Sequence, residues 1–296
     1  MPLRTSPLDA PGYTRVDSES VGELLLRYDT VILDLDGVVL RYSQPIPGVD
    51  RTLRHLRKQG RRVRVSSNSM RRTPRHISQT LTALDIPLAE EDILTSGRVT
   101  LDFLSRLPVE SPGVLAFGCN GLEGDFERIG LKCFDPGKPV EVERIGMVVV
   151  GAIEETAFRL ELYEAALNAA VRGVPVIATS LDLTVPARQG LKMGSGLLAQ
   201  FLIMALKQDT RNVHVTGKPG AIYFDFLREH FLGREPGRCI FVGDTLLTDI
   251  TGARDAGFDT LFVLSGNDDL AYMRHLGIRP DFISASIAEG ESYAKG

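Results

Sequence analysis

The sequence has few cysteines, no long hydrophobic run and no excess of basic charge. Its three cysteines, Cys119, Cys133 and Cys239, form no close pair and therefore give neither a disulfide framework nor a zinc-ligand spacing. The simplest interpretation is that they are buried thiols in a reducing compartment. The net charge of -4 argues against a general affinity for nucleic acid or for an anionic membrane.

The apolar stretches and the N-terminal segment argue against a membrane span and a signal peptide. The longest apolar stretches, near residues 145–153 and 197–206, are well short of the roughly 20 residues that span a bilayer. Residues 1–20 carry Pro, Gly, Ser and charged residues without a periodic pattern, and their start lacks the apolar core of a signal peptide. We therefore expect a flexible N-terminal arm over residues 1–20 and a cytoplasmic protein with no membrane segment.

Short runs rich in β-branched residues alternate with helical patterns along the rest of the chain. The run 31–35 is almost continuously apolar, as expected of a strand covered on both faces. The other predicted strands are residues 63–65, 114–117, 147–150, 174–177, 213–215, 239–242 and 261–264. This alternation predicts an α/β fold with mostly parallel sheets. One sheet would need too many strands, so we expect a core, residues 21–107 and 208–296, and a second α/β domain, residues 108–207, inserted after Pro and Gly breaks.

Two aspartates, Asp34 and Asp36, close the first predicted strand. Residues i and i+2 of an extended chain point the same way, so both carboxylates face the carboxyl end of the strand, where open α/β sheets bind ligands. Two like charges there need a proton or a cation, and an all-oxygen pair favours Mg²⁺. Alternatively, the two residues only cap a turn at the end of the strand.

Two further polar clusters follow predicted strands. Residues 66–69, Ser-Ser-Asn-Ser, combine hydroxyl and amide groups with backbone N–H groups that can cradle phosphate oxygens, although an ordinary turn has the same composition. Lys218, between Gly217 and Pro219, offers one fixed positive charge that can neutralise a phosphate and a carboxylate together. The alternative for Lys218 is an exposed loop position.

A fourth cluster follows the predicted strand 239–242. Asp244 comes at the carboxyl end of this strand, and Asp249 follows five residues later at a helix start, where it could simply cap the helix. The joint pattern is more specific than any single cluster. Four strand ends carry, in chain order, Asp34 with Asp36, Ser66, Lys218 and Asp244.

This order of motifs resembles the haloacid dehalogenase superfamily, in particular its subclass IIA phosphatases, which include nitrophenyl phosphatase, phosphoglycolate phosphatase and pyridoxal phosphatase enzymes. The resemblance covers residues 28–290. Two positions depart from the family pattern, because Ser67 stands where an Asn is usual and Ser180-Leu181-Asp182 stands where the cap loop usually reads Asn-Pro-Asp. The resemblance implies a Rossmann-like, doubly wound parallel sheet as the core and a large α/β cap as the inserted domain.

The same resemblance implies a Mg²⁺-dependent phosphatase that hydrolyses a small phosphorylated metabolite. Asp34 would be the nucleophile that forms an aspartyl-phosphate, and Asp36 would be the general acid and base. Ser66 and Lys218 would complete the catalytic set. The phosphate-binding residues would be Ser66, Ser67, Asn68 and Lys218. Mg²⁺ would bind to Asp34, to the backbone carbonyl of Asp36 and to Asp244, with Asp249 in the outer shell. The expected substrate contacts from the cap are Asp182, Arg188 and Lys192.

Other functions stay open beside this one. Phosphoryl transfer to an acceptor other than water would use the same residues, and a non-catalytic phosphometabolite-binding module would be favoured if a motif residue were missing. A dinucleotide-binding protein is disfavoured, because the first turn carries acidic residues where pyrophosphate should bind. Residues 51–84 hold ten Arg and Lys and no acidic residue, but no interleaved aromatics, so we interpret them as a basic face that attracts an anionic substrate rather than a nucleic-acid site. The apolar spacing of residues 158–171 suits either a core or a homodimer interface.

Overall fold

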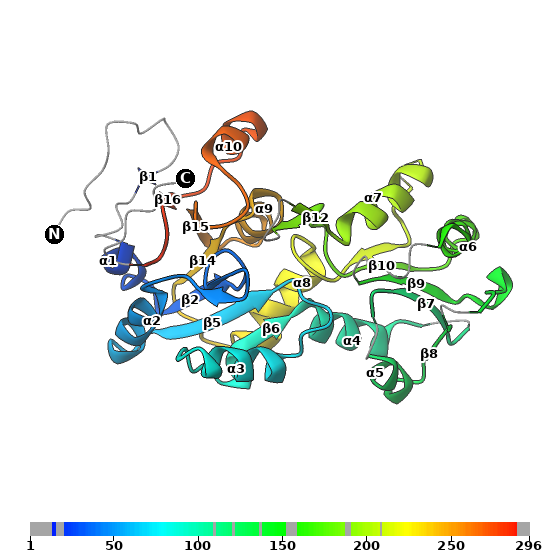
Figure 1. Cartoon of the computed structure of the whole chain (residues 1–296), viewed down its shortest axis with the longest axis horizontal. Helices are drawn as coiled ribbons and strands as arrows, with labels where there is room; N and C mark the ends of the chain where they lie inside the picture. Colours follow the sequence, from blue (N-terminus) through cyan, green and yellow to red (C-terminus); the bar gives the residue numbers. More distant parts are fainter. Residues whose placement is uncertain are drawn as a thin grey trace.

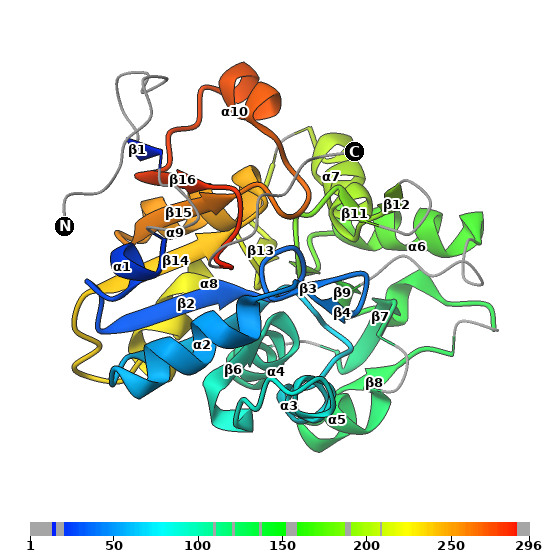
Figure 2. The same cartoon turned by 60° about the vertical axis from the view of Figure 1, so that its left-hand side comes forward.

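The computed structural model describes residues 14–15, 21–108, 111–119, 122–135, 138–151, 159–186, 191–207 and 209–288. The strands form two larger sheets, of seven and five strands, that lie side by side with helices packed around them (Figures 1 and 2). All strand pairs within these two sheets are parallel. The predicted α/β class with parallel sheets is therefore confirmed.

The seven-stranded sheet has the order β1-β16-β15-β14-β2-β5-β6. Its strands are β1 (Thr14–Arg15), β2 (Thr30–Asp34), β5 (Arg62–Ser67), β6 (Ile93–Thr95), β14 (Cys239–Gly243), β15 (Asp259–Val263) and β16 (Phe282–Ser284). Successive residues of β2 pack on opposite faces, because Val31 and Leu33 belong to one buried cluster and Ile32 to another. Burial of each such side chain stabilises the fold by about 1.5–3 kcal/mol. This explains why β2 is apolar without alternation.

Helices cover both faces of this sheet (Figure 2). The helices around it are α1 (Val21–Leu25), α2 (Val49–Lys58), α3 (Pro74–Ala83), α4 (Ser96–Arg106), α8 (Ala221–Phe226), α9 (Thr251–Asp255) and α10 (Leu270–Leu276). The Thr73 and Thr95 hydroxyls accept hydrogen bonds from the first turns of α3 and α4. Each such N-terminal cap stabilises its helix by about 1 kcal/mol. Two π-helical turns, Leu227–Phe231 and Leu246–Ile250, follow α8 and precede α9.

The five-stranded sheet has the order β13-β10-β9-β7-β8. Its strands are β7 (Gly113–Phe117), β8 (Lys132–Cys133), β9 (Met147–Val150), β10 (Val176–Ala178) and β13 (Val213–Val215). The helices of this part of the chain are α5 (Glu123–Arg128), α6 (Leu160–Val171) and α7 (Gly196–Ala205). The boundary at residue 207 assigned residues 213–215 to the core, but β13 pairs with β10 and so belongs to the inserted sheet.

The expected N-terminal arm and two short hairpins complete the fold. Of residues 1–20 the structure describes only Thr14 and Arg15, which form β1 and pair with β16 rather than remaining unpaired. A hairpin of β3 (Leu40–Arg41) and β4 (Gln44–Pro45) follows β2, and a hairpin of β11 (Thr184–Pro186) and β12 (Leu191–Met193) projects from the inserted domain. Both hairpins contribute residues to the cavity described below.

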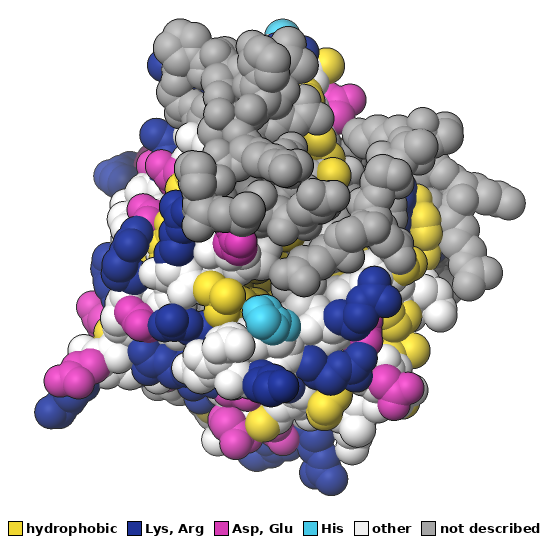
Figure 3. Space-filling model, turned by 90° about the vertical axis from the view of Figure 1, so that its left-hand side faces the viewer, with side chains coloured by type: hydrophobic (Ala, Val, Ile, Leu, Met, Phe, Trp, Pro, Cys, Tyr) yellow, Lys and Arg dark blue, Asp and Glu magenta, His cyan; other side chains and the backbone are white. Residues whose placement is uncertain are grey.

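Some of the basic residues in segment 51–84 pair with acidic residues outside it. Arg54, Arg61 and Arg64 form ion pairs with Asp50, Asp29 and Asp92. Figure 3 shows Lys and Arg side chains interspersed with Asp and Glu over one face of the molecule. None of the helices in the described ranges combines the length and apolarity needed to cross a bilayer.

Candidate active site

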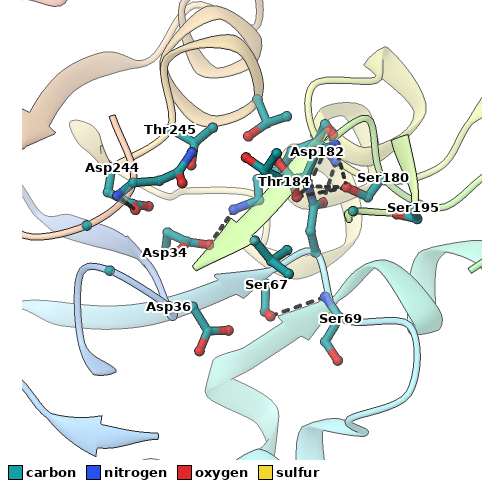
Figure 4. Close-up of a pocket in the computed structure, with 18 of the residues that line it drawn as sticks. Asp34, Asp36, Ser67, Ser69, Ser180, Asp182, Thr184, Ser195, Asp244 and Thr245 are labelled. Carbon is teal, nitrogen blue, oxygen red and sulfur yellow. Dashed lines mark hydrogen bonds and ion pairs between the residues drawn. The ribbon is translucent and has the colours of Figure 1, made fainter. Parts of the chain in front are cut away.

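A cavity of about 1190 Å³ lies where the carboxyl ends of the core strands meet the inserted domain. Asp34 is the last residue of β2, and Asp244 directly follows β14. Lys218 enters from β13 of the five-stranded sheet, not from a core strand as expected. The structure thus brings together, around one cavity, the predicted residues Asp34, Asp36, Ser67, Asn68, Asp182, Lys192, Lys218, Asp244 and Asp249 (Figure 4).

A buried lysine lies at the centre of the site. The Lys218 ammonium donates hydrogen bonds to Asp34 Oδ1 at 2.5 Å and to Asp249 Oδ1 at 2.6 Å, and the side chain is almost completely buried. Asp249 Oδ2 in turn accepts the backbone N–H groups of Asp244 and Thr245, at 3.2 and 3.1 Å. Asp249 therefore holds both Lys218 and the backbone that carries Asp244. The outer-shell position expected for Asp249 stays a prediction.

The acidic groups of the site outnumber its one buried cation. Asp34, Asp244 and Asp249 each offer a carboxylate oxygen, and these three atoms lie within 4.8 Å of one another. Burial raises the pKa of Asp34 to about 8, with the charge of Lys218 opposing the shift and that of Asp249 adding to it. Burial, and then the charge of Asp34, also raises the pKa of Asp244 well above its usual value. For Lys218, burial lowers the pKa, but Asp249 and Asp34 more than offset this and hold it well above its ordinary value.

The residues present fit a hard divalent cation. If all three buried carboxylates are ionised, one ammonium group leaves two negative charges uncompensated, and carboxylate oxygens are the ligands that Mg²⁺ prefers. Two glycines make room beside Asp244. A Cβ atom at Gly37 or at Gly266 would lie 2.1 or 1.9 Å from Asp244 Oδ2. No larger side chain can enter there unless that carboxylate moves.

Asp36 lies at the edge of the cavity rather than in the buried cluster. Its side chain is 48% exposed and forms an ion pair with Arg72, whose other terminal nitrogen lies 3.5 Å from Asp36 Oδ1. Figure 4 shows the Asp36 carboxylate turned away from that of Asp34. Arg72 is itself held by Ser69, whose hydroxyl accepts the Arg72 backbone N–H at 2.9 Å. An ion pair this exposed is worth at most about 1 kcal/mol, so it can break when a ligand enters.

The hydroxyl residues at the end of β5 divide between two environments. Ser67 lines the cavity, and its Oγ accepts the backbone N–H of Ser69 at 3.2 Å. Ser66, which we expected to contact the phosphoryl group, is fully buried with its Oγ 2.8 Å from the hydroxyl of Tyr223. Burial, opposed by the charge of Lys218, raises the pKa of Tyr223 to about 12. Tyr223 could not be found from the sequence, because an aromatic residue in an apolar helix such as α8 looks like an ordinary core position.

Of the three residues of the inserted domain expected to contact the substrate, the structure describes two. Asp182 and Lys192 both line the cavity. Arg188 lies outside the described residues. Ser180 holds the Asp182 loop in shape, because its Oγ donates to Asp182 Oδ2 at 2.8 Å and accepts the Asp182 backbone N–H at 2.9 Å. The cavity is therefore bounded by ordered polar groups from both domains.

The chain is similar to known hydrolases in its sequence. Residues 31–132 match the family model of the haloacid dehalogenase-like hydrolases, and residues 215–290 match a second model of the same kind of hydrolase. A dihydroxyacetone phosphatase of Corynebacterium glutamicum is 27% identical over 258 residues, which cover 87% of this chain and 89% of that protein.

Two solved structures resemble the whole described architecture. A p-nitrophenyl phosphatase from Archaeoglobus fulgidus has a TM-score of 0.73 at 26% identity, covering 88% of this chain and 97% of that one. A glycerol phosphate phosphatase from Mycobacterium tuberculosis, determined in complex with magnesium, has a TM-score of 0.69 at 26% identity, covering 89% of this chain and 76% of that one.

Proposed function

Because the chain belongs to the haloacid dehalogenase-like hydrolases, we propose that it is a magnesium-dependent phosphatase that hydrolyses a small phosphate monoester. The observation that carries this proposal is the buried Asp34–Lys218 pair, 2.5 Å apart, beside Asp244 and Asp249 at the base of a cavity between two domains. The names of the relatives support the reaction class, since all three described above are phosphatases of small esters.

In the first half-reaction, a carboxylate oxygen of Asp34 attacks the phosphorus atom and the ester P–O bond breaks, which leaves an aspartyl-phosphate. Lys218 holds Asp34 Oδ1, fixes the rotamer of the nucleophile and balances its charge against the incoming phosphate. Asp36 donates a proton to the departing alkoxide oxygen. For this step the exposed pair of Asp36 with Arg72 has to open.

In the second half-reaction, a water molecule attacks the phosphorus atom of the aspartyl-phosphate and Asp36 accepts its proton. Inorganic phosphate leaves and the Asp34 carboxylate is restored. Ser67, at the cavity wall, is placed to donate to a phosphoryl oxygen, while Ser66 supports the end of β5 through Tyr223. Bound Mg²⁺, held by Asp34, Asp244 and the backbone carbonyl of Asp36, would supply positive charge against the phosphoryl oxygens.

The direct test is release of inorganic phosphate from p-nitrophenyl phosphate and from glycerol phosphate, measured with Mg²⁺ and with a chelator. We expect release that depends on Mg²⁺ with at least one of the two esters. Adding an alcohol acceptor separates hydrolysis from transfer, because a phosphotransferase would place the phosphoryl group on the alcohol. Absence of phosphate release, or its complete replacement by transfer, would contradict the proposal.

The raised pKa values predict how stability depends on pH and metal. The folded protein binds protons at Asp34 more tightly than the unfolded chain does, so this group contributes stability below about pH 4 that is lost as pH rises through about 8. Mg²⁺ replaces those protons and should therefore raise Tm more at pH 8 than at pH 5. If the stabilisation by Mg²⁺ differs by about 1 kcal/mol between the two pH values, the shifts in Tm should differ by roughly 2–4 °C. In Asp34→Asn, the rise in Tm caused by Mg²⁺ should differ less between pH 8 and pH 5. An equal rise at both pH values in the unsubstituted protein would contradict this prediction.

Replacing the proposed acid should discriminate between leaving groups. In Asp36→Asn we expect kcat/KM to fall about 10²-fold more for glycerol phosphate than for p-nitrophenyl phosphate. The reason is that p-nitrophenolate departs without a proton whereas an alkoxide needs one, and kcat/KM reports the steps up to that departure. Asp102→Asn, in an exposed ion pair on α4, is the matched control and should change neither value. Equal losses with both esters would remove Asp36 from the acid role.

A further inference from the structure

Asn68 uses both ends of its side-chain amide for contacts within the protein. Its Oδ1 accepts the backbone N–H of Lys218 at 2.7 Å. Its Nδ2 donates to Asp182 Oδ2 at 2.8 Å, and lies 3.2 Å from both Ser180 Oγ and the Lys218 carbonyl oxygen. A backbone N–H can donate only to an oxygen, so the orientation of the amide is fixed and its NH₂ group faces the carboxylate.

These contacts join three segments that are far apart in the sequence. Asn68 follows β5 of the core, Asp182 lies in the loop after β10 of the inserted domain, and Lys218 lies where the chain returns to the core. The junction is tightly packed, since a Cβ atom at Gly217 would lie 1.9 Å from the Thr179 carbonyl oxygen and 2.9 Å from Asn68 Oδ1. The position of Asp182 is therefore coupled to that of Lys218 through one amide group.

The two hydrogens of the Asn68 NH₂ group already face three acceptors, so neither is left for a phosphate oxygen. Asp182, by contrast, lines the cavity, where a carboxylate accepts hydrogen bonds from hydroxyl groups. Figure 4 shows Asp182 and Ser180 together on the side of the cavity formed by the inserted domain. This is the side from which a leaving group would be contacted.

We propose that Asn68 is a specificity-determining positioning residue, which ties the Asp182 loop to the Lys218 segment so that Asp182 meets a hydroxyl group of the substrate's leaving alcohol. The inference rests on the proposed phosphatase function and narrows its substrate class to phosphate esters of hydroxyl-bearing alcohols. Asn68 acts through Asp182 and does not itself touch the phosphoryl group.

The test compares leaving groups with and without hydroxyls. In the full-length, Mg²⁺-loaded enzyme, kcat and KM are measured for glycerol phosphate and p-nitrophenyl phosphate, together with the inhibition constant of inorganic phosphate. In Asn68→Ala we expect KM for glycerol phosphate to rise about tenfold, the loss of one charge-assisted hydrogen bond. KM for p-nitrophenyl phosphate and the inhibition constant of phosphate should change clearly less than this, because these ligands carry no alcohol hydroxyl and are affected only by the loss of the acceptor for the Lys218 backbone N–H.

A double-mutant cycle with Asp182→Ala tests the coupling directly. If the two residues act as a unit, the double variant binds glycerol phosphate no more weakly than Asp182→Ala alone. Asn68→Ser keeps a polar group that is too short to reach both partners, so it is a second variant with the same expectation. Asn212→Ala is the matched control, since the Asn212 amide donates to Gly173 on the exposed surface and should change none of the constants.

Three results would overturn the inference while leaving the phosphatase intact. Inhibition by phosphate weakened as much as glycerol phosphate binding would make Asn68 a phosphate ligand. Additive effects in the cycle would show that Asn68 does not act through Asp182. Wild-type turnover of p-nitrophenyl phosphate without turnover of glycerol phosphate would remove the hydroxyl contact. Absence of turnover with both esters would overturn the proposed function and this inference together.

Discussion

Asp34→Asn is expected to lower Mg²⁺-dependent turnover of p-nitrophenyl phosphate by at least about 10⁴-fold, the order of loss seen when a covalent nucleophile is removed. An amide has nearly the same shape as a carboxylate but is a poor nucleophile, so the substrate still binds while the first P–O bond does not break. Asn also removes one negative charge from a buried cluster that is rich in them. The folded state should therefore be retained, and in metal-free protein at pH 8 we expect Tm to rise.

Two measurements on Asp34→Asn test whether Asp34 is the nucleophile. Release of p-nitrophenolate should disappear while the thermal unfolding midpoint is unchanged or raised. Asp50→Asn is a matched substitution on the exposed surface of α2, where Asp50 pairs with Arg54, and should leave turnover as it was. Normal turnover in Asp34→Asn would exclude this residue as the nucleophile.

Lys218→Met is expected to lower both the stability of the protein and kcat. Methionine fills a similar volume without charge, so Asp34 and Asp249 lose a shared partner that lies 2.5 and 2.6 Å away. Breaking a buried pair on one side costs about 3–5 kcal/mol, and loss of the charge opposite the phosphate should lower kcat about 10³-fold. The destabilisation should be larger at pH 8 than at pH 5, because protonated carboxylates no longer need the ammonium group.

Chemical denaturation at both pH values, without metal, checks the stability part of this prediction. Lys138→Met removes the same group from an exposed site, where Lys138 is 76% exposed and pairs with Asp135. For Lys138→Met we expect the free energy of unfolding to change by no more than about 0.5 kcal/mol. A Lys218→Met protein as stable as the Lys138→Met control at pH 8 would mean that the buried carboxylates do not depend on Lys218.

The sequence was sufficient for the class of fold and for placing Asp34 and Asp244 at the carboxyl ends of strands. Carboxyl ends of parallel strands meet at one edge of a sheet, so Asp34 and Asp244 were expected at the same edge, and the family resemblance joined them in one metal site. The apolar run of β2 is a local signal, and the structure buries all five residues of this strand as expected.

Other features depend on distant partners and could not be found this way. The three residues of β13 suit either sheet, and only pairing with β10 decides which one contains them. The Ser66–Tyr223 contact joins residues 157 positions apart, and a polar serine after a strand gives no sign that it is buried. Likewise, an asparagine beside a predicted phosphate cradle does not reveal that its amide is occupied by Asp182 and Lys218.

The membership of β13 in the five-stranded sheet has a consequence for exchanging domains between related proteins. Residues 213–215 are hydrogen-bonded to β10, and Lys218 comes three residues after this strand. A chimaera joined at residue 207 would separate the edge strand β13 from its own sheet. Lys218 would then follow a strand that comes from the other protein. A junction after Lys218 would keep β13 with its own sheet, so a transplanted inserted domain would bring Lys218 with it.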